Sequence, residues 1–187
     1  ESQASGPLAE AIRQAETALG IKITQAVVGM PKYPVRQESS TGKIDGRGYD
    51  TDITTEDIAE LKRSAQDMYP LENPNMEAIY GAVAQSFSNG EDFQIIEDDI
   101  VGMTSDTLEG NFKIFIGAKA ALKRIDKVMR SVELVPVKKY FQPQFTASAV
   151  LYSSEIDNGV ALIDFGGGCT SVSVFYKSIL RHYASIP

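Results

Sequence analysis

The chain has almost none of the residue types that build disulfides and transition-metal sites. Its 187 residues include one cysteine, Cys169, and one histidine, His182. A single cysteine excludes an internal disulfide and any cysteine-cluster zinc site. A single histidine excludes most histidine-based metal sites and disfavours catalysis that depends on a histidine base.

Long apolar runs and net positive charge are also missing. No stretch has the length of a membrane-spanning helix, and the first residues lack the basic and apolar pattern of a secretory leader. The net charge of −7 argues against non-specific binding of nucleic acid. We therefore expect a cytoplasmic protein without a nucleic-acid partner. Because the chain begins with Glu1 and stops at Pro187 directly after a strand pattern, we expect both ends to be internal to a longer protein.

The chain does have enough apolar residues, 43%, to bury a core. Helix and strand patterns alternate along it, which predicts an α/β fold with a mixed sheet and an α+β insert. Helices are predicted for residues 7–19, for a segment that Thr54 or Thr55 caps and whose apolar stripe reaches Met68, and for residues 119–132 and 146–152. Strands are predicted for residues 25–30, 33–40, 79–87, 112–116, 135–141, 160–163, 172–176 and 180–185.

Residues 31–117 have a helix and strands of their own, and they are predicted to form a separate small subdomain. Within this region, residues 41–52 are polar and contain three glycines, so we expect a loop there. The acidic residues 91–99 are expected to form a second, solvated loop.

The most informative pattern lies near the C-terminus. An apolar run at residues 160–163 leads to Asp164, three consecutive glycines follow at residues 166–168, and alternation resumes at residues 171–176. This order predicts a strand, a glycine turn and a second strand, with an acid at the end of the first strand.

Those residue types suit a phosphate site. Glycine reaches positive φ without steric cost and leaves no Cβ in the way of an anion, and successive backbone N–H groups can form a concave anion site. The Asp164 carboxylate would hold a hydrated Mg²⁺, an ion that keeps several waters and uses few protein ligands. Thr170 or Ser171 can add a hydroxyl donor to a phosphate oxygen.

Two commoner glycine motifs are excluded. A P-loop needs Gly-Lys-Ser/Thr at the start of a helix, and no Gly-Lys pair of this chain is followed by Ser or Thr. A dinucleotide fingerprint also opens a helix, whereas a strand pattern follows the glycines here. The alternative that remains is a glycine-rich hairpin that binds no ligand.

The segment IDFGGGCTSVSVFYKSILRHYASIP resembles the second phosphate motif of the superfamily of actin, heat-shock chaperones and sugar kinases. Within that superfamily it is most similar to the FtsA family of bacterial cell-division proteins. Three further segments resemble FtsA passages in the same order: ITQAVVGMP, ITTEDIAEL and DDIVGMTSDTLEGNFKIFIGA. A fourth, TASAVLYSSEIDNGVALIDFGGG, joins them to the glycine motif.

The resemblance implies a partial actin-like, ribonuclease H-like fold with an inserted FtsA-type subdomain 1C. Residues 1–30 would belong to subdomain 1A and residues 31–117 to the SHS2-like subdomain 1C. Residues 118–157 would return to subdomain 1A, and residues 158–187 would begin subdomain 2A.

The resemblance also implies a function, an ATP-binding scaffold at the division septum. FtsA-like proteins bind ATP with Mg²⁺, contact other FtsA molecules in filaments or dimers, and tether FtsZ polymers to the inner face of the cell membrane. The membrane contact is a C-terminal helix outside these residues, and subdomain 1C recruits later divisome proteins. We expect a weak ATPase at most, not a metabolic enzyme, and no tight ATP binding by these 187 residues alone.

The site residues carry over position by position. The phosphate-binding residues implied are Gly166, Gly167, Gly168, Cys169 and Thr170, and the metal residue implied is Asp164, through water. Cys169 stands where the family has threonine, and Ser171 stands where it has a second aspartate. Both departures remove strong polar groups, so they predict weaker nucleotide binding.

Two other functions of the same superfamily stay open, a PilM-like actin homologue of pilus assembly and a sugar or acetate kinase. The remaining candidates are given structural roles. Arg181 is expected to be a solvated charge at a strand edge, His182 a surface or packing residue, and Asp57 a partner of a helix N-terminus. Phe112 and Phe115 are expected in the core rather than on a ligand surface.

Overall fold

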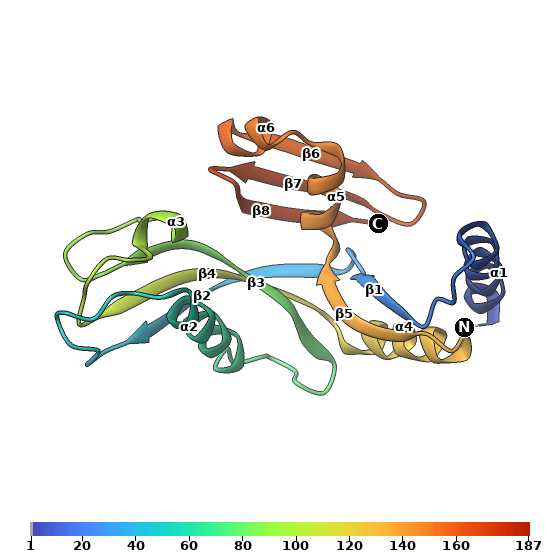
Figure 1. The fold of residues 1–187 in the computed structure, drawn as a ribbon, viewed down its shortest axis with the longest axis horizontal. Helices are drawn as coiled ribbons and strands as arrows, with labels where there is room; N and C mark the ends of the chain where they lie inside the picture. The colour runs from blue at the N-terminus through green and yellow to red at the C-terminus, as the bar shows by residue number, and fades with distance from the viewer. Residues whose placement is uncertain (1) are drawn as a thin grey trace.

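Three small sheets joined by helices organise the chain in the computed structural model, which describes residues 2–187 (Figure 1). The first is a parallel pair, β1 (Gln25–Met30) with β5 (Val135–Phe141). Helix α1 (Ser2–Leu19) precedes β1, and α4 (Lys119–Ser131) precedes β5 and packs against α1. Parallel pairing needs a long connection between its strands, and the whole second sheet lies within that connection.

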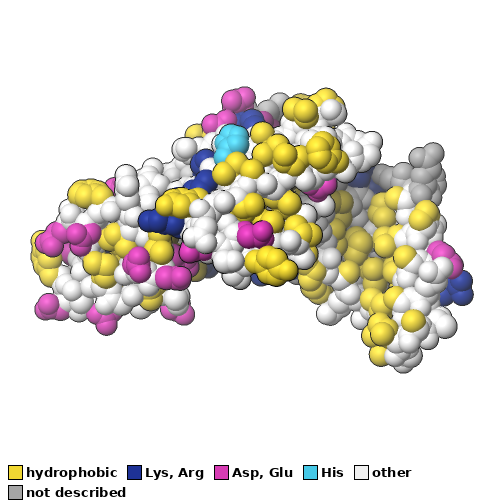
Figure 2. Space-filling model, turned by 90° about the horizontal axis from the view of Figure 1, so that it is seen from above, with side chains coloured by type: hydrophobic (Ala, Val, Ile, Leu, Met, Phe, Trp, Pro, Cys, Tyr) yellow, Lys and Arg dark blue, Asp and Glu magenta, His cyan; other side chains and the backbone are white. Residues whose placement is uncertain are grey.

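The second sheet is antiparallel, with β4 (Leu108–Ala118) between β2 (Val35–Ile44) and β3 (Glu77–Ser88). Helix α2 (Thr55–Asp67) packs on one face of it, and the short α3 (Glu97–Ile100) follows β3. Acidic side chains gather at the far end of this sheet, away from β1 and β5 (Figure 2).

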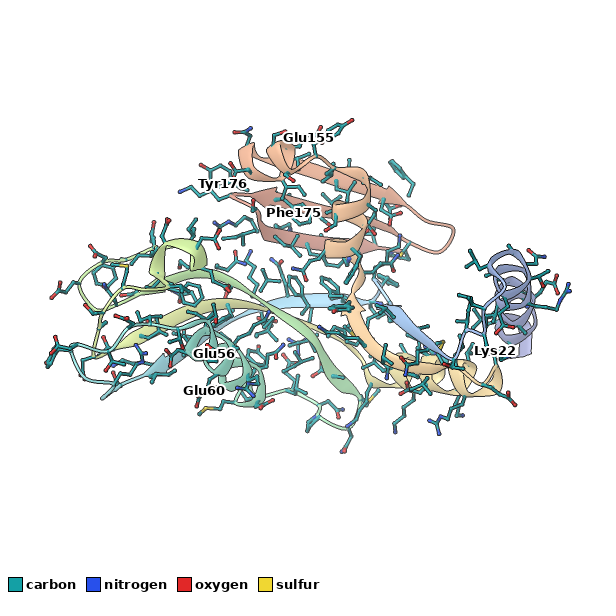
Figure 3. All side chains as sticks on the ribbon, in the orientation of Figure 1. Lys22, Glu56, Glu60, Glu155, Phe175 and Tyr176 are labelled. Carbon is teal, nitrogen blue, oxygen red and sulfur yellow. The ribbon has the colours of Figure 1, made fainter. Side chains whose placement is uncertain are left out.

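The third sheet is also antiparallel, in the order β6 (Val160–Phe165), β7 (Thr170–Tyr176) and β8 (Ile179–Ile186). Helices α5 (Gln142–Val150) and α6 (Ser153–Asn158) connect it to β5. Side chains alternate between its faces, because successive Cβ atoms of a strand point in opposite directions. Phe175 is buried against the body of the molecule, whereas Tyr176 is half-exposed (Figure 3).

The apolar residues form two cores on the two faces of β4. Residues of the first core lie between the β2-β4-β3 sheet and α2, and include Ile58, Leu61, Phe112, Ile114 and Ile116. Residues of the second core join all three sheets, and include Met30, Phe115, Phe141, Phe175, Leu180 and Tyr183. Strand β4 is therefore covered on both faces, and Phe112 and Phe115 are core residues as predicted.

Three aromatic rings hold the sheets together. Phe115 of β4 stacks on Phe141 of β5 with ring centroids 4.4 Å apart. Tyr183 of β8 meets both rings edge to face, at 6.2 Å from Phe115 and 4.9 Å from Phe141. Such pairs contribute about 0.5–1.5 kcal/mol each beyond the apolar area that they bury.

Most predicted elements are confirmed, and the strands predicted at residues 25–30 and 135–141 agree with the structure at both ends. The loop predicted for residues 41–52 is wrong in its first part, because β2 continues to Ile44. Gly42 serves close packing there: a Cβ at this position would lie 2.9 Å from Leu61 Cδ1 of α2. Gly42 pairs with Gly110 of β4, and a Cβ at Gly110 would meet the same leucine.

Three helix predictions need correction as well. Met68 does not extend the apolar stripe of α2, because the helix ends at Asp67 and the Met68 side chain is 80% exposed. The helix predicted at 146–152 begins at Gln142, with Pro143 in its first turn, where a proline costs no hydrogen bond. The acidic segment 91–99 is not wholly loop, because α3 begins at Glu97.

None of the helices that the structure describes combines the length and apolar character needed to cross a membrane.

Candidate functional site

The glycine motif forms the turn between β6 and β7, as the sequence predicts. Asp164 pairs with Ser171 and Phe165 with Thr170, which leaves a four-residue connection, residues 166–169. The backbone N–H of Gly166 donates to the Cys169 carbonyl at 3.0 Å and closes the turn.

Gly166 is needed for space, and none of the three glycines of this turn is needed for a left-handed backbone. Positive φ angles occur at other glycines of the chain, and Gly166, Gly167 and Gly168 have none. A Cβ at Gly166 would lie 2.9 Å from the Cys169 carbonyl oxygen and 3.2 Å from Lys32 Nζ. A Cβ at Gly167 or Gly168 would meet no atom within 4 Å, so these two residues border open space.

Asp164 is paired with a cation that the sequence analysis missed. Its Oδ2 atom accepts a hydrogen bond from Lys32 Nζ at 2.6 Å, and the two side chains are 29% and 16% exposed. Lys32 lies two residues after the end of β1 and 132 positions before Asp164. The signal that the sequence offers for it is a basic residue shortly after a predicted strand.

A narrow crevice surrounds this ion pair. Besides Lys32 and Asp164, its lining side chains come from α5 and from the third sheet: Gln142, Pro143, Thr146, Leu162, Ser171 and Ser173. Gln142 and Pro143 are the first residues of α5. A helix N-terminus carries partial positive charge from its unpaired N–H groups, which favours an anion nearby.

Tyr183 of β8 holds the backbone of Lys32 in place. Its hydroxyl donates to the Lys32 carbonyl, and the side chain is buried in the aromatic cluster with Phe115 and Phe141. Burial raises the pKa of the Tyr183 phenol, and the negative charge of Asp164 raises it further. The phenol therefore stays protonated and remains a donor at neutral pH.

The two positions that depart from the family pattern have different surroundings. Ser171 is buried and lines the crevice beside Asp164. Cys169 is a free, partly buried cysteine at the end of the turn, and Thr170 is partly buried as the first residue of β7.

The residues present fit a hydrated cation and a phosphate better than a fully coordinated metal. Among the residues described, no three His, Cys, Asp or Glu side chains come together as a metal cluster. A Mg²⁺ held through water needs only one or two carboxylates, and Asp164 supplies one. The side of the turn at Gly167 and Gly168 is free of side chains, so a phosphate could reach the backbone there.

Two of the remaining candidate residues have the roles predicted for them. Asp57 caps the N-terminus of α2 together with Thr54 in a reciprocal capping box. His182 is exposed, and its Nδ1 lies 2.9 Å from Gln37 Nε2.

Arg181 lies on the edge strand β8 as predicted, but the prediction that its charge is solvated is wrong. Its guanidinium is partly buried and donates to the Gln85 carbonyl on β3 at 2.8 Å. Burial lowers the pKa of Arg181, and burial together with the nearby guanidinium lowers the pKa of Lys113. Both side chains join the third sheet to the second, because Lys113 of β4 donates to the Arg181 carbonyl.

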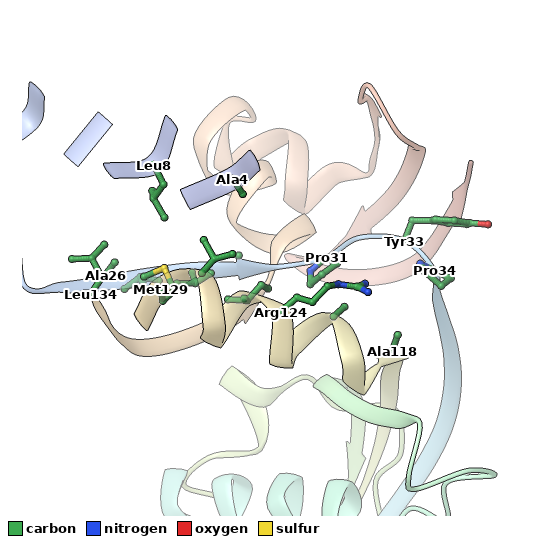
Figure 4. A pocket seen from close by; sticks show the side chains of 16 residues that line it. Ala4, Leu8, Ala26, Pro31, Tyr33, Pro34, Ala118, Arg124, Met129 and Leu134 are labelled. Carbon is green, nitrogen blue, oxygen red and sulfur yellow. The ribbon is translucent and has the colours of Figure 1, made fainter. Parts of the chain in front are cut away.

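A larger cavity lies elsewhere, between α1, β1 and α4 (Figure 4). It measures about 640 Å³ and is apolar, and Arg124 is the one charged residue among those that line it. It does not include the glycine turn or Asp164.

No protein-family model matches the chain. Several curated proteins are similar to it in sequence. The cell division protein FtsA of Neisseria meningitidis serogroup B is 28% identical over 178 residues, which is 95% of this chain and 41% of that protein. FtsA of Enterococcus hirae is 30% identical over 171 residues, 91% of this chain and 38% of that protein. FtsA of Bacillus subtilis is 26% identical over 179 residues, which is 95% of this chain and 39% of that protein.

Among solved structures, a PilM-PilN type IV pilus biogenesis complex contains a chain that superposes with a TM-score of 0.58 at 12% identity. The superposition covers 96% of this chain and 47% of that chain. This likeness, together with the mixed parallel and antiparallel sheets, defines the fold as a partial actin-like fold.

The chain is a relative of the cell division protein FtsA, and it spans about two fifths of the length of the curated relatives that it matches.

Proposed function

We propose that these residues belong to an actin-like ATP-binding scaffold of bacterial cell division. The observation that carries the proposal is the similarity to FtsA proteins over 91–95% of the chain, which spans all three sheets. The scaffold would tether FtsZ polymers to the inner face of the cell membrane at the division site. Its membrane contact would be a C-terminal amphipathic helix that is not among these residues.

Each of the three sheets would correspond to one subdomain of the scaffold. The β1-β5 pair with its helices would be part of subdomain 1A, as residues 1–30 and 118–157. The β2-β4-β3 sheet would be subdomain 1C, residues 31–117, which would contact other FtsA molecules and recruit later division proteins. The β6-β7-β8 sheet would begin subdomain 2A.

In this proposal the β6-β7 turn holds the terminal phosphates of ATP. The open backbone of Gly167 and Gly168 and the residues that follow, Cys169 and Thr170, would donate to phosphate oxygens. Asp164 would orient a Mg²⁺ through water, and the ion would supply charge neutralisation for the phosphates. A Cβ at Gly166 would disturb both the turn and Lys32, so this glycine is the most sensitive position.

Binding of a fluorescent ATP analogue to the full-length protein tests the nucleotide part of the proposal. The wild type is expected to bind in Mg²⁺, and Gly166→Val is expected to lose at least about tenfold in affinity, or about 1.4 kcal/mol. Gly6→Ala, in helix α1 with open space around it, serves as the control. Equal affinity of wild type and Gly166→Val would remove the phosphate site from this turn.

Co-sedimentation tests the scaffold part. The full-length protein is mixed separately with FtsZ polymers and with liposomes that contain anionic lipid. The polymers or the liposomes are then pelleted, and the protein in the pellet is measured. Recovery with both partners is the expected result. Recovery with neither, under conditions where a known FtsA is pelleted, would contradict the tethering function.

A PilM-like role in pilus assembly is the second candidate, and the TM-score of 0.58 to the chain of the PilM-PilN complex is the observation that favours it. The same co-sedimentation separates the two. A full-length protein that lacks a membrane-binding terminal helix, ignores FtsZ and binds a short peptide from a pilus assembly partner would fit the PilM-like role.

A further inference from the structure

We propose that Lys32 supplies the main positive charge for the phosphate at the β6-β7 turn, so that anion binding there depends only weakly on Mg²⁺. The inference rests on the proposed nucleotide site and deepens it. It assigns a role to a residue that the FtsA pattern did not point to.

The first support is the position of the Lys32 ammonium between the acid and the glycine turn. Nζ lies 2.6 Å from Asp164 Oδ2. A Cβ built on Gly166 would come within 3.2 Å of the same atom, so the ammonium stands against the bare side of this glycine. The ammonium therefore lies beside the first glycine of the turn that would hold a phosphate.

The second support is the charge of the site. Asp164 and Lys32 together carry no net charge, and at the paired position across the hairpin Ser171 adds none. A Mg²⁺ at Asp164 would have to share the carboxylate with the ammonium already bonded to it, so the ion pair weakens the contribution of Mg²⁺ to binding. A phosphate is attracted by the same ammonium, since lysine is a compact point charge that suits phosphate oxygens.

The third support is that Lys32 is held in place. Its side chain is 16% exposed, and its carbonyl accepts the hydroxyl hydrogen of Tyr183, whose ring is 3% exposed in the aromatic cluster. The N-terminal residues of α5 line the same crevice and add partial positive charge. A preorganised cation loses little conformational entropy when it binds an anion.

Nucleotide binding with and without Mg²⁺ tests the proposal on the full-length protein. A fluorescent ATP analogue is titrated in Mg²⁺ and in EDTA into the wild type, Lys32→Met and Lys32→Arg. The wild type is expected to differ by less than about threefold between the two buffers, which is below 1 kcal/mol. Lys32→Met is expected to lose at least about tenfold in EDTA and to recover most of that loss in Mg²⁺, while Lys32→Arg keeps the wild-type behaviour.

Lys22→Met is the matched control, because Lys22 lies between α1 and β1 (Figure 3) and is not among the residues that line the crevice around Asp164. Its side chain is 76% exposed and pairs with Glu16. This variant is expected to bind the nucleotide as the wild type does in both buffers.

A second readout needs no nucleotide. The unfolding free energies of Lys32→Met, Asp164→Asn and the double variant form a thermodynamic cycle, which measures the coupling of the two side chains. A favourable coupling is expected. If Lys32→Met does not fold, the comparison of Lys32→Arg with Lys32→Gln replaces it in both measurements.

The outcomes separate this inference from the function on which it rests. A wild type that binds the analogue in Mg²⁺ but loses about tenfold or more in EDTA overturns the role of Lys32 and leaves the nucleotide site standing. A Lys32→Met variant that binds the analogue with wild-type affinity in both buffers also overturns the role of Lys32 and leaves the nucleotide site standing. A wild type that binds the analogue in neither buffer overturns the nucleotide site itself, and this inference with it.

Discussion

The side-chain oxygen of Gln37 accepts a hydrogen bond from the backbone N–H of Tyr183 at 3.0 Å, across 146 positions of the sequence. The amide nitrogen of the same side chain lies 2.9 Å from His182 Nδ1. One glutamine of β2 thus satisfies two polar groups of β8 and joins the second sheet to the third.

Replacing Gln37 is expected to weaken that junction. Gln37→Ala leaves the Tyr183 N–H, which belongs to a buried residue, without its partner, and the cost is about 1–3 kcal/mol of unfolding free energy. Urea unfolding of the 187-residue chain measures it. The exposed Gln144 of α5 provides the control, since Gln144→Ala should change stability by less than about 0.5 kcal/mol. An equally small effect for both variants would mean that the glutamine bridge does not contribute.

Gly117 is expected to reject even a methyl group. A Cβ at Gly117 would overlap the ring of Tyr80, which is 5% exposed and donates its hydroxyl to the Ala118 carbonyl at 2.9 Å. Gly117→Ala should therefore cost about 1–3 kcal/mol through overpacking. Gly6→Ala, in helix α1 with open space around it, should instead be neutral or stabilise by up to about 1 kcal/mol. Thermal unfolding of both variants measures these effects. A Gly117→Ala variant with the melting temperature of the wild type would contradict the prediction.

The capping box of α2 is expected to make stability depend on acid pH. Burial by itself would raise the pKa of Asp57, but hydrogen bonds from the Thr54 N–H and hydroxyl, both at 2.8 Å, and the charge of Arg47 hold it below its ordinary value of 3.8. A carboxyl whose pKa is lowered by folding stabilises the fold above its unfolded pKa. That stabilisation is lost as the pH falls through the lowered pKa.

Asp57→Asn should accordingly cost about 0.5–2 kcal/mol at pH 7 and progressively less as the pH falls below 3.8. Urea unfolding at neutral and at acid pH measures both values. Asp67→Asn, at the exposed C-terminal end of the same helix, is the control. A loss that is the same at both pH values would show that the carboxylate charge is not what the cap needs.

Strand β1 is expected to promote self-association. Among the residues described, β1 pairs with β5 alone, and an unpaired strand edge is a template for another chain. Light scattering of the 187-residue chain should show mass that rises with concentration. Val27→Lys, which places a charge on a residue that is 58% exposed on β1, should suppress the rise, whereas Val150→Lys at the end of α5 should not. A wild type that stays monomeric over a wide concentration range would contradict the prediction.

Sequence patterns predicted the outline of this fold well where local rules decide the structure. The strands at residues 25–30 and 135–141 are short segments with β-branched and aromatic residues, and helix α4 has an uninterrupted apolar stripe. The same patterns misplaced the end of β2, because Gly42 reads as a turn residue. The glycine in fact makes room for Leu61 of α2, and that contact joins residues far apart in the sequence.

The candidate site shows the same division. The order of Asp164, three glycines and a second strand predicted a β-hairpin, and the β6-β7 pairing confirms the hairpin. Whether the hairpin binds phosphate stays a prediction. Lys32 could not be found from spacing, because it lies 132 positions away and meets Asp164 only through the approach of two sheets.

The sequence by itself determined the alternation of helices and strands, the glycine hairpin and the resemblance to FtsA, because these depend on periodicity and on short motifs. Only the tertiary structure decided which groups meet across the sheets: Lys32 with Asp164, Gln37 with Tyr183, and Arg181 with Gln85. Such pairs depend on burial and on the packing of both faces of β4, and neither is encoded in local spacing. The charge of Lys32 at the carboxylate of Asp164 is therefore a property of the folded chain.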